Sequence, residues 1–505
     1  MDRTRGLSWL AAAGIVSSLL IMIVASVFAR SITVPNVPRS SGLPLEIWAK
    51  LPDVVVTFGT WAAVVLGAVG VFAGLIAVRR GARYPSWLLI GGGLVAVFVF
   101  ALLPAAGSTD TVSYAVYGRM AVLGRSPYLT TPYQLARLGD PIGIAAMHQP
   151  YWHFAISHYG PIATAEEWAA AKLGGTSVNA IILWLKLWNA IMFAAIALGM
   201  DRLLRSDPAR RARAHLVWTV NPLVIWVLIA AGHVDVLAAG FGFAGLMILR
   251  ARPGDGRVAL PAALGAGLLV GLACDIMFDY FLFAPALAWA LRKQWQAFGA
   301  AALGGLIALG PASLWAGTAY FRGFAGRSGF AGADSFYGLI SPAFRGHLPS
   351  GMALLVELAC IALALLLLWR LPDGPPDLPA IRPALAFSLA WLFLFYYTLP
   401  WYNAMAIGLL AVYPASRLDW AVIGQFAIAT FANLPGLVYY LHPHWVSYAA
   451  KISSFKFMPL LLFVAVVALV WLCVTRRWQP GVGREPRRAT PPALSGATAQ
   501  QRLLS

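Results

Sequence analysis

The sequence is poor in charged side chains, above all in acidic ones. Among its 505 residues only 19 are Asp or Glu, and charged residues of both signs amount to 11%. A soluble globular domain carries about 25% charged residues, so this composition excludes an ordinary soluble protein. The hydrophobic share of 60% and the mean hydropathy of +0.74 indicate a protein that lies in a membrane.

Three further features are missing. Cys274, Cys360 and Cys473 form neither a CxxC pair nor a Cys/His cluster, which argues against a disulfide framework and a zinc site. There is no glycine-rich phosphate loop on the predicted inside, and no cofactor is expected. No internal repeat is evident, and this counts against a transporter built from repeated halves.

Apolar runs long enough to cross a bilayer recur along the chain. We place fourteen spans near residues 7–29, 54–78, 86–106, 177–200, 214–231, 235–250, 258–274, 278–291, 295–316, 350–369, 383–399, 402–416, 418–438 and 456–475. The predicted fold is all-α: a polytopic helical membrane protein in which residues 1–478 form a single transmembrane bundle. Residues 479–505 are rich in Pro, Arg, Ala and Thr, which predicts a disordered basic tail.

The basic residues indicate which way the bundle faces. With the N-terminus inside, 24 of the 37 Lys and Arg lie in inside segments, against 12 in outside segments or at their span ends. Lys and Arg favour the cytoplasmic side, so we expect a multi-pass protein of the cell membrane with both termini in the cytoplasm. The net charge of +18 then reflects this bias and implies membrane lipids, not nucleic acid, as partners.

The predicted outer face holds most of the unusual polar residues. Its two long segments are 107–176 and 317–349, and seven of the eight histidines lie on this face or at its span ends. Residues 110–123 and 162–172 have the spacing of short helices that lie along the membrane interface. Because titratable side chains gather here, we expect the active site on the extracytoplasmic face.

Asp110 is the leading candidate for a catalytic group. It directly follows an apolar span, where an ionisable residue is costly and commonly functional. In a helix, Asp110, Tyr114 and Tyr117 share one face, and Arg119 follows closely in sequence. A carboxylate in this position is suited to accept a proton from a hydroxyl group, although it equally suits the N-cap of the helix that follows.

Two outer-face strings combine titratable and aromatic side chains. His158 and Tyr159 precede a Gly-Pro turn, and His233 and Asp235 lie two residues apart in an apolar context. A charged or polar pair in such a context is costly unless it is hydrogen bonded or hydrated. The His233 string therefore fits either a substrate-binding site or a mutually hydrogen-bonded helix end.

Other candidates lie at the edges of later spans. Trp401 and Tyr402 fit either a platform for sugar stacking or an aromatic belt at the membrane surface. Arg322 and Arg327 lie in the glycine-rich segment 317–349, which suits a mobile lid that binds a lipid phosphate, or one that contacts lipid headgroups.

The sequence allows two interpretations for each of three charged residues that lie inside or beside apolar spans. Lys186 lies in mid-span and suits pairing with a phosphate, or else extends its ammonium group to the membrane surface. Asp275 and Asp279 lie one helical turn apart, which fits either metal ligation or hydrogen bonds to a sugar.

Taken in order, these strings resemble the GT-C superfamily of glycosyltransferases, which use polyprenyl-phosphate sugars. More narrowly, the chain is similar to the bacterial polyprenol-phosphate-mannose-dependent α-1,6-mannosyltransferases. The similarity runs from about residue 100 to 405, over the strings Asp110–Arg119, Gly124–Tyr128, Tyr159–Pro161, Asn221-Pro222, Gly232–Asp235 and Pro400–Tyr402. The chain departs from the family pattern at Val234, where an Asn is expected, and it lacks a Lys ahead of Pro285.

The resemblance implies a GT-C-like bundle and an inverting glycosyltransferase of cell-envelope biogenesis. Its donor would be a polyprenyl monophosphate sugar, most simply mannose, its acceptor a glycan or a glycolipid on the outer face, and it would need no metal. Asp110 would be the general base, and the substrate-binding residues would be Tyr114, Tyr117, Arg119, His158, Tyr159, His233, Asp235, Arg322, Arg327, Trp401 and Tyr402. Two alternatives stay open: a GT-C enzyme for another lipid-linked sugar (arabinose, glucose or aminoarabinose), and a membrane transporter or lipid flippase.

Overall fold

The computed structural model describes residues 3–252, 254, 256–325, 330–332, 335–435 and 441–478. Within these ranges the secondary structure is helical, with isolated β-bridges and no extended strand. The predicted all-α class is confirmed. The predicted tail 479–505 lies outside the described residues, so its state remains a prediction.

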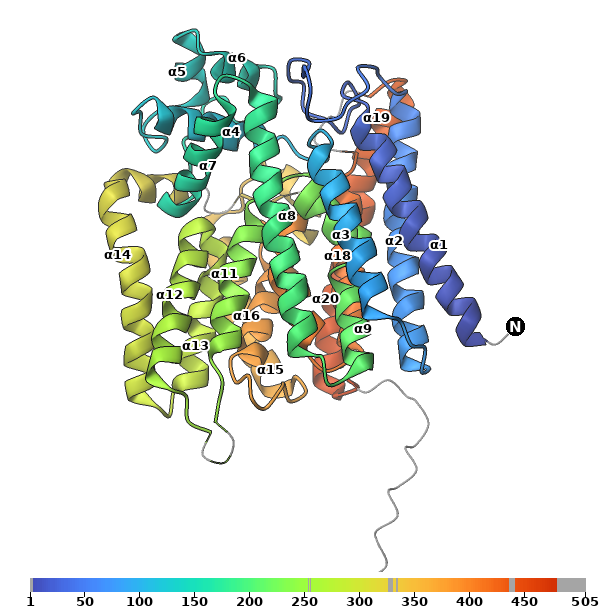
Figure 1. The fold of residues 1–505 in the computed structure, drawn as a ribbon, viewed down its shortest axis with the longest axis vertical. Coiled ribbons are helices and arrows are strands. Elements are labelled where there is room, and N and C mark those ends of the chain that lie inside the picture. Colours follow the sequence, from blue (N-terminus) through green and yellow to red (C-terminus); the bar gives the residue numbers. More distant parts are fainter. Residues whose placement is uncertain are drawn as a thin grey trace, which may run out of the picture.

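The predicted spans coincide with apolar helices that together form a bundle (Figure 1). By length and composition, six of the described helices are able to cross a membrane, or seven if a bent pair counts as one span. The other predicted spans correspond to shorter apolar helices of 10–17 residues, so helix length does not confirm fourteen full crossings. The bundle helices are α1 (Arg3–Val27), α2 (Asp53–Arg79), α3 (Ser86–Leu102), α8 (Val178–Leu203), α11 (Asp235–Ile248), α12 (Leu260–Ile276), η2 (Phe278–Leu282), α13 (Phe283–Leu291), α14 (Trp295–Ala325), α15 (Ser350–Arg370), α16 (Ile381–Leu394), α17 (Ala404–Val412), α18 (Leu418–Ala432) and α20 (Met458–Thr475).

The span predicted as one helix over 214–231 is broken in the structure. Helix α9 (Pro208–Val217) ends, and helical structure resumes in α10 (Pro222–Ile225) and the π-helical turn η1 (Trp226–Ala230), with a bend of 44°. Pro222 lacks the N–H that a continuous helix needs. Asn221 starts the new helix by accepting a hydrogen bond from the Leu223 N–H at 3.1 Å. The predicted span is therefore a bent pair of helices, and η1 leads into the turn that carries His233.

Four short helices form a cap over one end of the bundle: α4 (Asp110–Val122), α5 (Pro132–Arg137), α6 (Pro141–Met147) and α7 (Pro161–Gly174). Figure 1 shows this cap at the end opposite the α2–α3 and α8–α9 connections. Those two connections hold Arg80, Arg83 and Arg205, which the sequence places on the inside. The four short helices and these arginines thus lie at opposite ends of the bundle (Figure 1), and helices are present over both segments predicted as short helices.

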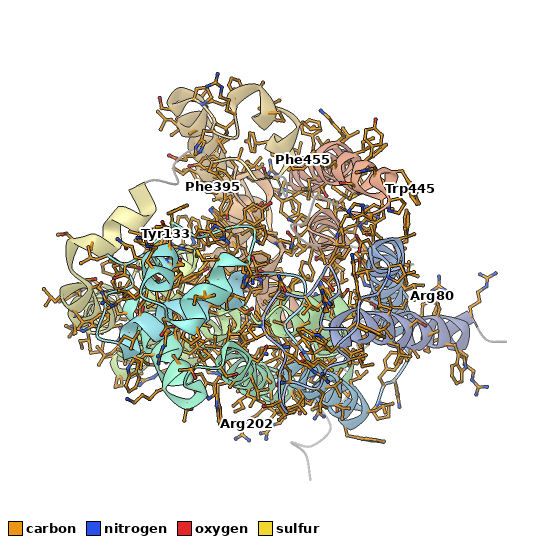
Figure 2. The ribbon with its side chains drawn as sticks, turned by 90° about the horizontal axis from the view of Figure 1, so that it is seen from above. Arg80, Tyr133, Arg202, Phe395, Trp445 and Phe455 are labelled. Atoms are coloured by element: carbon orange, nitrogen blue, oxygen red, sulfur yellow. The ribbon has the colours of Figure 1, made fainter. Side chains whose placement is uncertain are left out.

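The cap covers only part of the bundle when the molecule is seen from above (Figure 2). Tyr133 of α5 lies over one side, whereas Trp445 of α19 (His444–Ile452) lies on another side beside α2. There the Trp445 and Phe58 ring centroids are 5.8 Å apart. The remaining short elements are η3 (Phe336–Leu339), η4 (Ser341–Phe344), η5 (Pro400–Asn403) and η6 (Ser453–Phe457).

Candidate active site

Asp110 is the first residue of α4 and lies where the cap meets the bundle. Its side chain is 12% exposed, and its Oδ2 lies 3.8 Å from Nδ1 of His233. The N-cap position of α4 belongs to Thr109, and the Asp110 N–H donates to Oγ of Ser108 at 3.1 Å. The alternative interpretation of Asp110 as the N-cap residue is therefore wrong.

His233 is fully buried in the turn between η1 and α11, and it connects Asp110 to two tyrosines. Its Nδ1 lies 3.2 Å from the Tyr114 hydroxyl, closer than the 3.8 Å to Asp110, so the hydrogen bond is with Tyr114. The Tyr159 hydroxyl in turn donates to the Tyr114 hydroxyl at 3.3 Å. These side chains form a chain of polar contacts from α4 to the start of α7.

Burial keeps the His233 ring and the Tyr114 hydroxyl uncharged. It lowers the pKa of His233 to about 3. Burial, with smaller effects of nearby Tyr159 and Asp110, raises the pKa of the Tyr114 hydroxyl well above its ordinary value. Both groups are neutral at pH 7, so the approach of His233 to Asp110 is a polar contact and not an ion pair.

The ring of His233 stacks on Trp401 of η5. Their centroids are 3.7 Å apart and the ring planes differ by 15°. Trp401 is 5% exposed, so it does not belong to an aromatic belt, and that alternative is wrong for this residue. Nε2 of His233 has no hydrogen-bond partner among the described residues, which leaves one ring nitrogen for a group that enters the site.

Gly232 lets the His233 turn approach α4 and α8. Its φ of +71° falls in the left-handed region, which glycine adopts readily. A Cβ atom here would lie 2.6 Å from Cγ2 of Thr111 and 3.2 Å from Cγ of Lys186. Any larger residue would push this turn away from the start of α4.

Helix α8 holds the two segments that bring Asp110 and His233 together. Lys186 is 1% exposed, and its Nζ donates to the backbone carbonyls of Leu103 at 2.7 Å and Pro104 at 3.2 Å. One of the two alternatives for Lys186, the extension of its ammonium group to the membrane surface, is therefore wrong. One turn later, Nδ2 of Asn189 donates to the backbone carbonyl of His233 at 3.0 Å.

The acidic residues near the cluster have different environments. Asp235 is 1% exposed, and neither of its carboxylate oxygens has a hydrogen-bond partner among the described residues. The mutual hydrogen bond between His233 and Asp235, one of the two alternatives, is therefore not formed. Asp275 accepts a hydrogen bond from the Ile162 N–H of α7 at 2.6 Å. In the described part of the chain no group of three or more His, Cys, Asp or Glu could hold a metal ion.

Two predicted site residues, Tyr117 and Arg119, make hydrogen bonds within the cap. The Tyr117 hydroxyl donates to the Ala155 carbonyl at 3.2 Å. Nε of Arg119 donates to Oδ2 of Asp140, the N-cap of α6, at 2.8 Å. Both contacts hold parts of the cap together, and a role for these two residues in substrate binding remains a prediction.

The other predicted residues are neighbours of the cluster or fall outside the description. The ring of His158 packs on that of Tyr159 with centroids 4.0 Å apart. Tyr402 is buried, and its ring centroid lies 5.3 Å from that of Trp391. Arg322 belongs to α14, and Arg327 lies outside the described residues, so the predicted arginine lid remains a prediction.

Two cavities adjoin α4. One of about 850 Å³ lies near the C-terminal end of α4, between its following loop, α7, α12 and α14; Arg125, Tyr128, Trp168 and Trp315 are among its lining residues. The other, of about 510 Å³, adjoins the N-terminal end of α4 and is lined by Gly107, Ser108 and Thr109 together with polar residues of other segments. The first reaches Ala121, and at 1.5 Å per residue this is about 16 Å along α4 from Asp110.

A multi-pass apolar bundle, a helical cap and a buried polar cluster between them are typical of an enzyme that acts at a membrane surface. A family model described as "Alpha-(1->6)-mannopyranosyltransferase, N-terminal domain" matches residues 11–293, more than half of the chain. The chain belongs to this family and is a mannosyltransferase, which confirms the predicted resemblance and enzyme class. Comparison with curated proteins gives no match.

The interpretation of the sequence missed Asn189, although a signal for it exists. Asn189 lies three residues after Lys186 in an otherwise apolar run, so both side chains fall on one face of a helix. Two polar residues on one face of a membrane helix indicate contact with polar groups of the protein.

Proposed function

We propose that the protein transfers mannose, with inversion at the anomeric carbon, from a polyprenyl monophosphate donor to a hydroxyl group of a glycan or glycolipid. The mannosyl transfer comes from the family. The observation that carries the rest of the proposal is the position of Asp110, a carboxylate with 12% exposure at the junction of cap and bundle. Its Oδ2 lies 3.8 Å from Nδ1 of His233, which is hydrogen bonded to Tyr114.

In this reaction the acceptor hydroxyl passes its proton to the carboxylate of Asp110 while its oxygen attacks the anomeric carbon. The new carbon–oxygen bond forms opposite the phosphate. The bond from the anomeric carbon to the phosphate oxygen breaks, and its electron pair leaves with the polyprenyl phosphate. A well-placed general base contributes about 10²–10⁴-fold to the rate.

The neutral neighbours of Asp110 support this role. A cation beside a carboxylate lowers its pKa and weakens it as a base. Because burial holds His233 in its neutral form, it presents a polar but uncharged ring to Asp110. His233 and Tyr114 therefore orient the site without neutralising the base.

The cavity of about 850 Å³ supports a lipid-linked donor. It lies between α7 of the cap and the apolar helices α12 and α14, so a prenyl chain in the bilayer reaches it without crossing water. Trp168 and Trp315 are 44% and 64% exposed beside it. Arg125 lines the same cavity and is exposed at the end of α4 that lies farthest from Asp110, so it would contact lipid headgroups and not the phosphate at the reacting carbon. Arg322 and Arg327 are the candidates for contact with the donor phosphate.

The orientation follows from the charge distribution. The cap lies at the end opposite the arginine-bearing α2–α3 and α8–α9 connections (Figure 1). Because Lys and Arg favour the cytoplasmic side, the cap and Asp110 would face the extracytoplasmic side, and the N-terminus the cytoplasm.

The test is a transfer assay in lipid nanodiscs with radiolabelled polyprenyl-phosphate-mannose and an α-mannoside acceptor. Asp110→Asn should lower the rate by at least about 10²-fold, with binding of both substrates retained. Asp140→Asn is the matched control, because it removes a second buried carboxylate of the cap that lies against Arg119. Full transfer by Asp110→Asn would show that the base is wrong. Transfer of arabinose or glucose, but not mannose, from lipid carriers would overturn the choice of sugar.

A further inference from the structure

A third cavity, of about 820 Å³, lies between α8 and α11, away from the cap. Its lining begins at Met192 in the middle of α8 and extends to Ser206 in the α8–α9 connection, which Figure 1 shows at the end opposite the cap. The volume falls in the range of about 300–1,000 Å³ that is usual for small-ligand sites. Figure 2 shows Arg202, one of the lining residues, at the rim of the bundle, so the cavity opens sideways toward the lipid.

Three exposed arginines line one end of this cavity. Arg202 lies in the last turn of α8, Arg205 two residues after α8, and Arg250 two residues after α11. Both helices begin toward the cap and run away from it, because α8 follows α7 and α11 follows the His233 turn. The three guanidinium groups therefore gather at the end of the cavity that lies farthest from the cap.

The rest of the lining is mainly apolar and leaves open space. On α8 it extends from Met192 to Leu203, about 16 Å at 1.5 Å per residue. Gly199 lies in this stretch, and a Cβ atom there would meet nothing within 4 Å. The facing helices contribute Phe241, Ala244, Met247 and Leu269. The cavity thus has a cationic end and a long apolar wall, which is the division of a membrane lipid into headgroup and acyl chain.

The nearby acids do not neutralise the cationic end. Asp201, next to Arg202 in sequence, is already paired with Arg211 and hydrogen bonded to His215. Arg250 lies 4.0 Å from Asp377, and both side chains are more than half exposed, so this ion pair is weak. In the described part of the chain, Arg202 and Arg205 form no ion pair. A ligand with negative charge is therefore favoured here.

We propose that this cavity binds one anionic glycerophospholipid from the leaflet opposite the cap. Its phosphate accepts hydrogen bonds from the guanidinium groups, which suit phosphate oxygens, and an acyl chain lies along the apolar wall of α8 and α11. Basic pockets between transmembrane helices bind anionic headgroups in this way. A soluble anion would leave the apolar wall uncovered, and a neutral lipid would leave the arginines without a counter-charge.

The bound lipid would fill a gap between two helices of the active site. Met192 and Gly240 are in direct contact at the cap side of the cavity, since a Cβ atom on Gly240 would lie 2.1 Å from Sδ of Met192. Below this contact the helices leave the open space at Gly199. Met192 lies one turn after Asn189, which donates to the His233 carbonyl at 3.0 Å. We therefore expect the lipid to stabilise the part of α8 that supports the His233 turn.

The test is native mass spectrometry of the full chain released from nanodiscs with equal amounts of phosphatidylglycerol and phosphatidylcholine. The wild type should retain one phosphatidylglycerol in preference to phosphatidylcholine. Arg202→Gln, Arg205→Gln and Arg250→Gln should each weaken this binding about fivefold, the contribution of one basic residue beside an anionic lipid. Arg83→Gln is the matched control, because Arg83 is exposed at the same end of the bundle and outside the cavity.

A second variant tests the apolar wall without a change of charge. Gly199→Leu should fill the open space and reduce phosphatidylglycerol retention, whereas Gly92→Leu in α3, where a Cβ atom also meets nothing within 4 Å, should not. Thermal unfolding checks that each variant is folded, and phosphatidylglycerol nanodiscs should raise the Tm of the wild type more than that of the triple arginine variant.

Three results would overturn the lipid site. They are equal retention of the two phospholipids by the wild type, retention of phosphatidylglycerol that neither the arginine variants nor Gly199→Leu reduce, and retention of a polyprenyl phosphate in place of a phospholipid. None of these measurements involves mannosyl transfer, so the lipid site stands or falls independently of the proposed reaction.

Discussion

Helix α4 packs against α7 so closely at Gly118 that even a methyl group has no room. A Cβ atom on Gly118 would lie 2.0 Å from the backbone oxygen of Glu167, whereas real Cβ contacts essentially never fall below 3.0 Å. Gly118→Ala therefore requires α7 to move away from α4 by at least about 1 Å. The obstacle is backbone, so no side-chain rotation relieves it.

This displacement should affect both stability and rate. Overpacking of a well-packed contact costs about 1–3 kcal/mol, occasionally more, and we expect the upper part of that range. Tyr159 lies just before α7, and its hydroxyl donates to that of Tyr114 at 3.3 Å, so a shift of about 1 Å breaks this hydrogen bond. A misplacement of that size near a reaction site lowers the rate by up to about 10²-fold.

The assay compares thermal unfolding and mannosyl transfer of the purified variant with those of the wild type. Gly92→Ala in α3 is the matched control, because a Cβ there meets nothing within 4 Å. The control should be neutral or slightly stabilising, since alanine favours helix over glycine by about 1 kcal/mol. A Gly118→Ala protein that melts and transfers like the wild type would refute the close contact between α4 and α7.

Three other perturbations have defined outcomes. Lys186→Met removes the hydrogen bonds that fix the segment before Asp110, so steady-state kinetics should show a lower kcat with little change in the acceptor KM; the reverse pattern would contradict a positioning role. Burial raises the pKa of Glu166 from 4.5 to about 8. Between these two pH values the folded state holds a proton that the unfolded state releases. The free energy of unfolding of the wild type should therefore fall as pH rises through this interval, by at most about 1.4 kcal/mol per pH unit. Glu166→Gln should weaken that dependence without removing it, because burial also raises the pKa of the neighbouring Glu167, and melting curves at pH 5 and pH 8 that shift equally in both proteins would disprove it. Arg119→Gln and Asp140→Asn remove the same ion pair, so their effects on melting should not add in the double variant, and an increase in substrate KM for Arg119→Gln alone would restore Arg119 to the binding site.

The sequence was sufficient for the elements that depend on local signals. Helix α4 was expected over 110–123 and runs from Asp110 to Val122, because the Gly124-to-Pro127 stretch stops it. The sequence also predicted that Asp110 and His233 lie at the same end of the bundle, since both follow apolar runs that end on that side. Their separation of 3.8 Å did not follow, because it depends on how helices distant in the chain pack.

Other features depend on tertiary contacts that leave little trace in the sequence. From the sequence, Trp401 fitted both an aromatic belt at the membrane surface and a platform for sugar stacking. In the structure its ring stacks on that of His233, with the ring centroids 3.7 Å apart. The span over 214–231 was predicted without its bend, because the apolar run masks the effect of Pro222 on the backbone. The cavity of about 510 Å³ escaped notice because its walls come from five separate parts of the chain.

Helix α8 explains how irregular backbone is tolerated beside the active site. In a membrane, each backbone carbonyl needs a partner from the protein, and the chain leaves helical structure twice here: after α3 and in the turn after η1. Lys186 supplies donors for the first break and Asn189 for the second. Both donors lie on the same helix. The hydrogen bonds that satisfy the carbonyls at the two breaks therefore also fix the distance between Asp110 and His233. The polar residues of α8 therefore account for the meeting of Asp110, the proposed base, with His233.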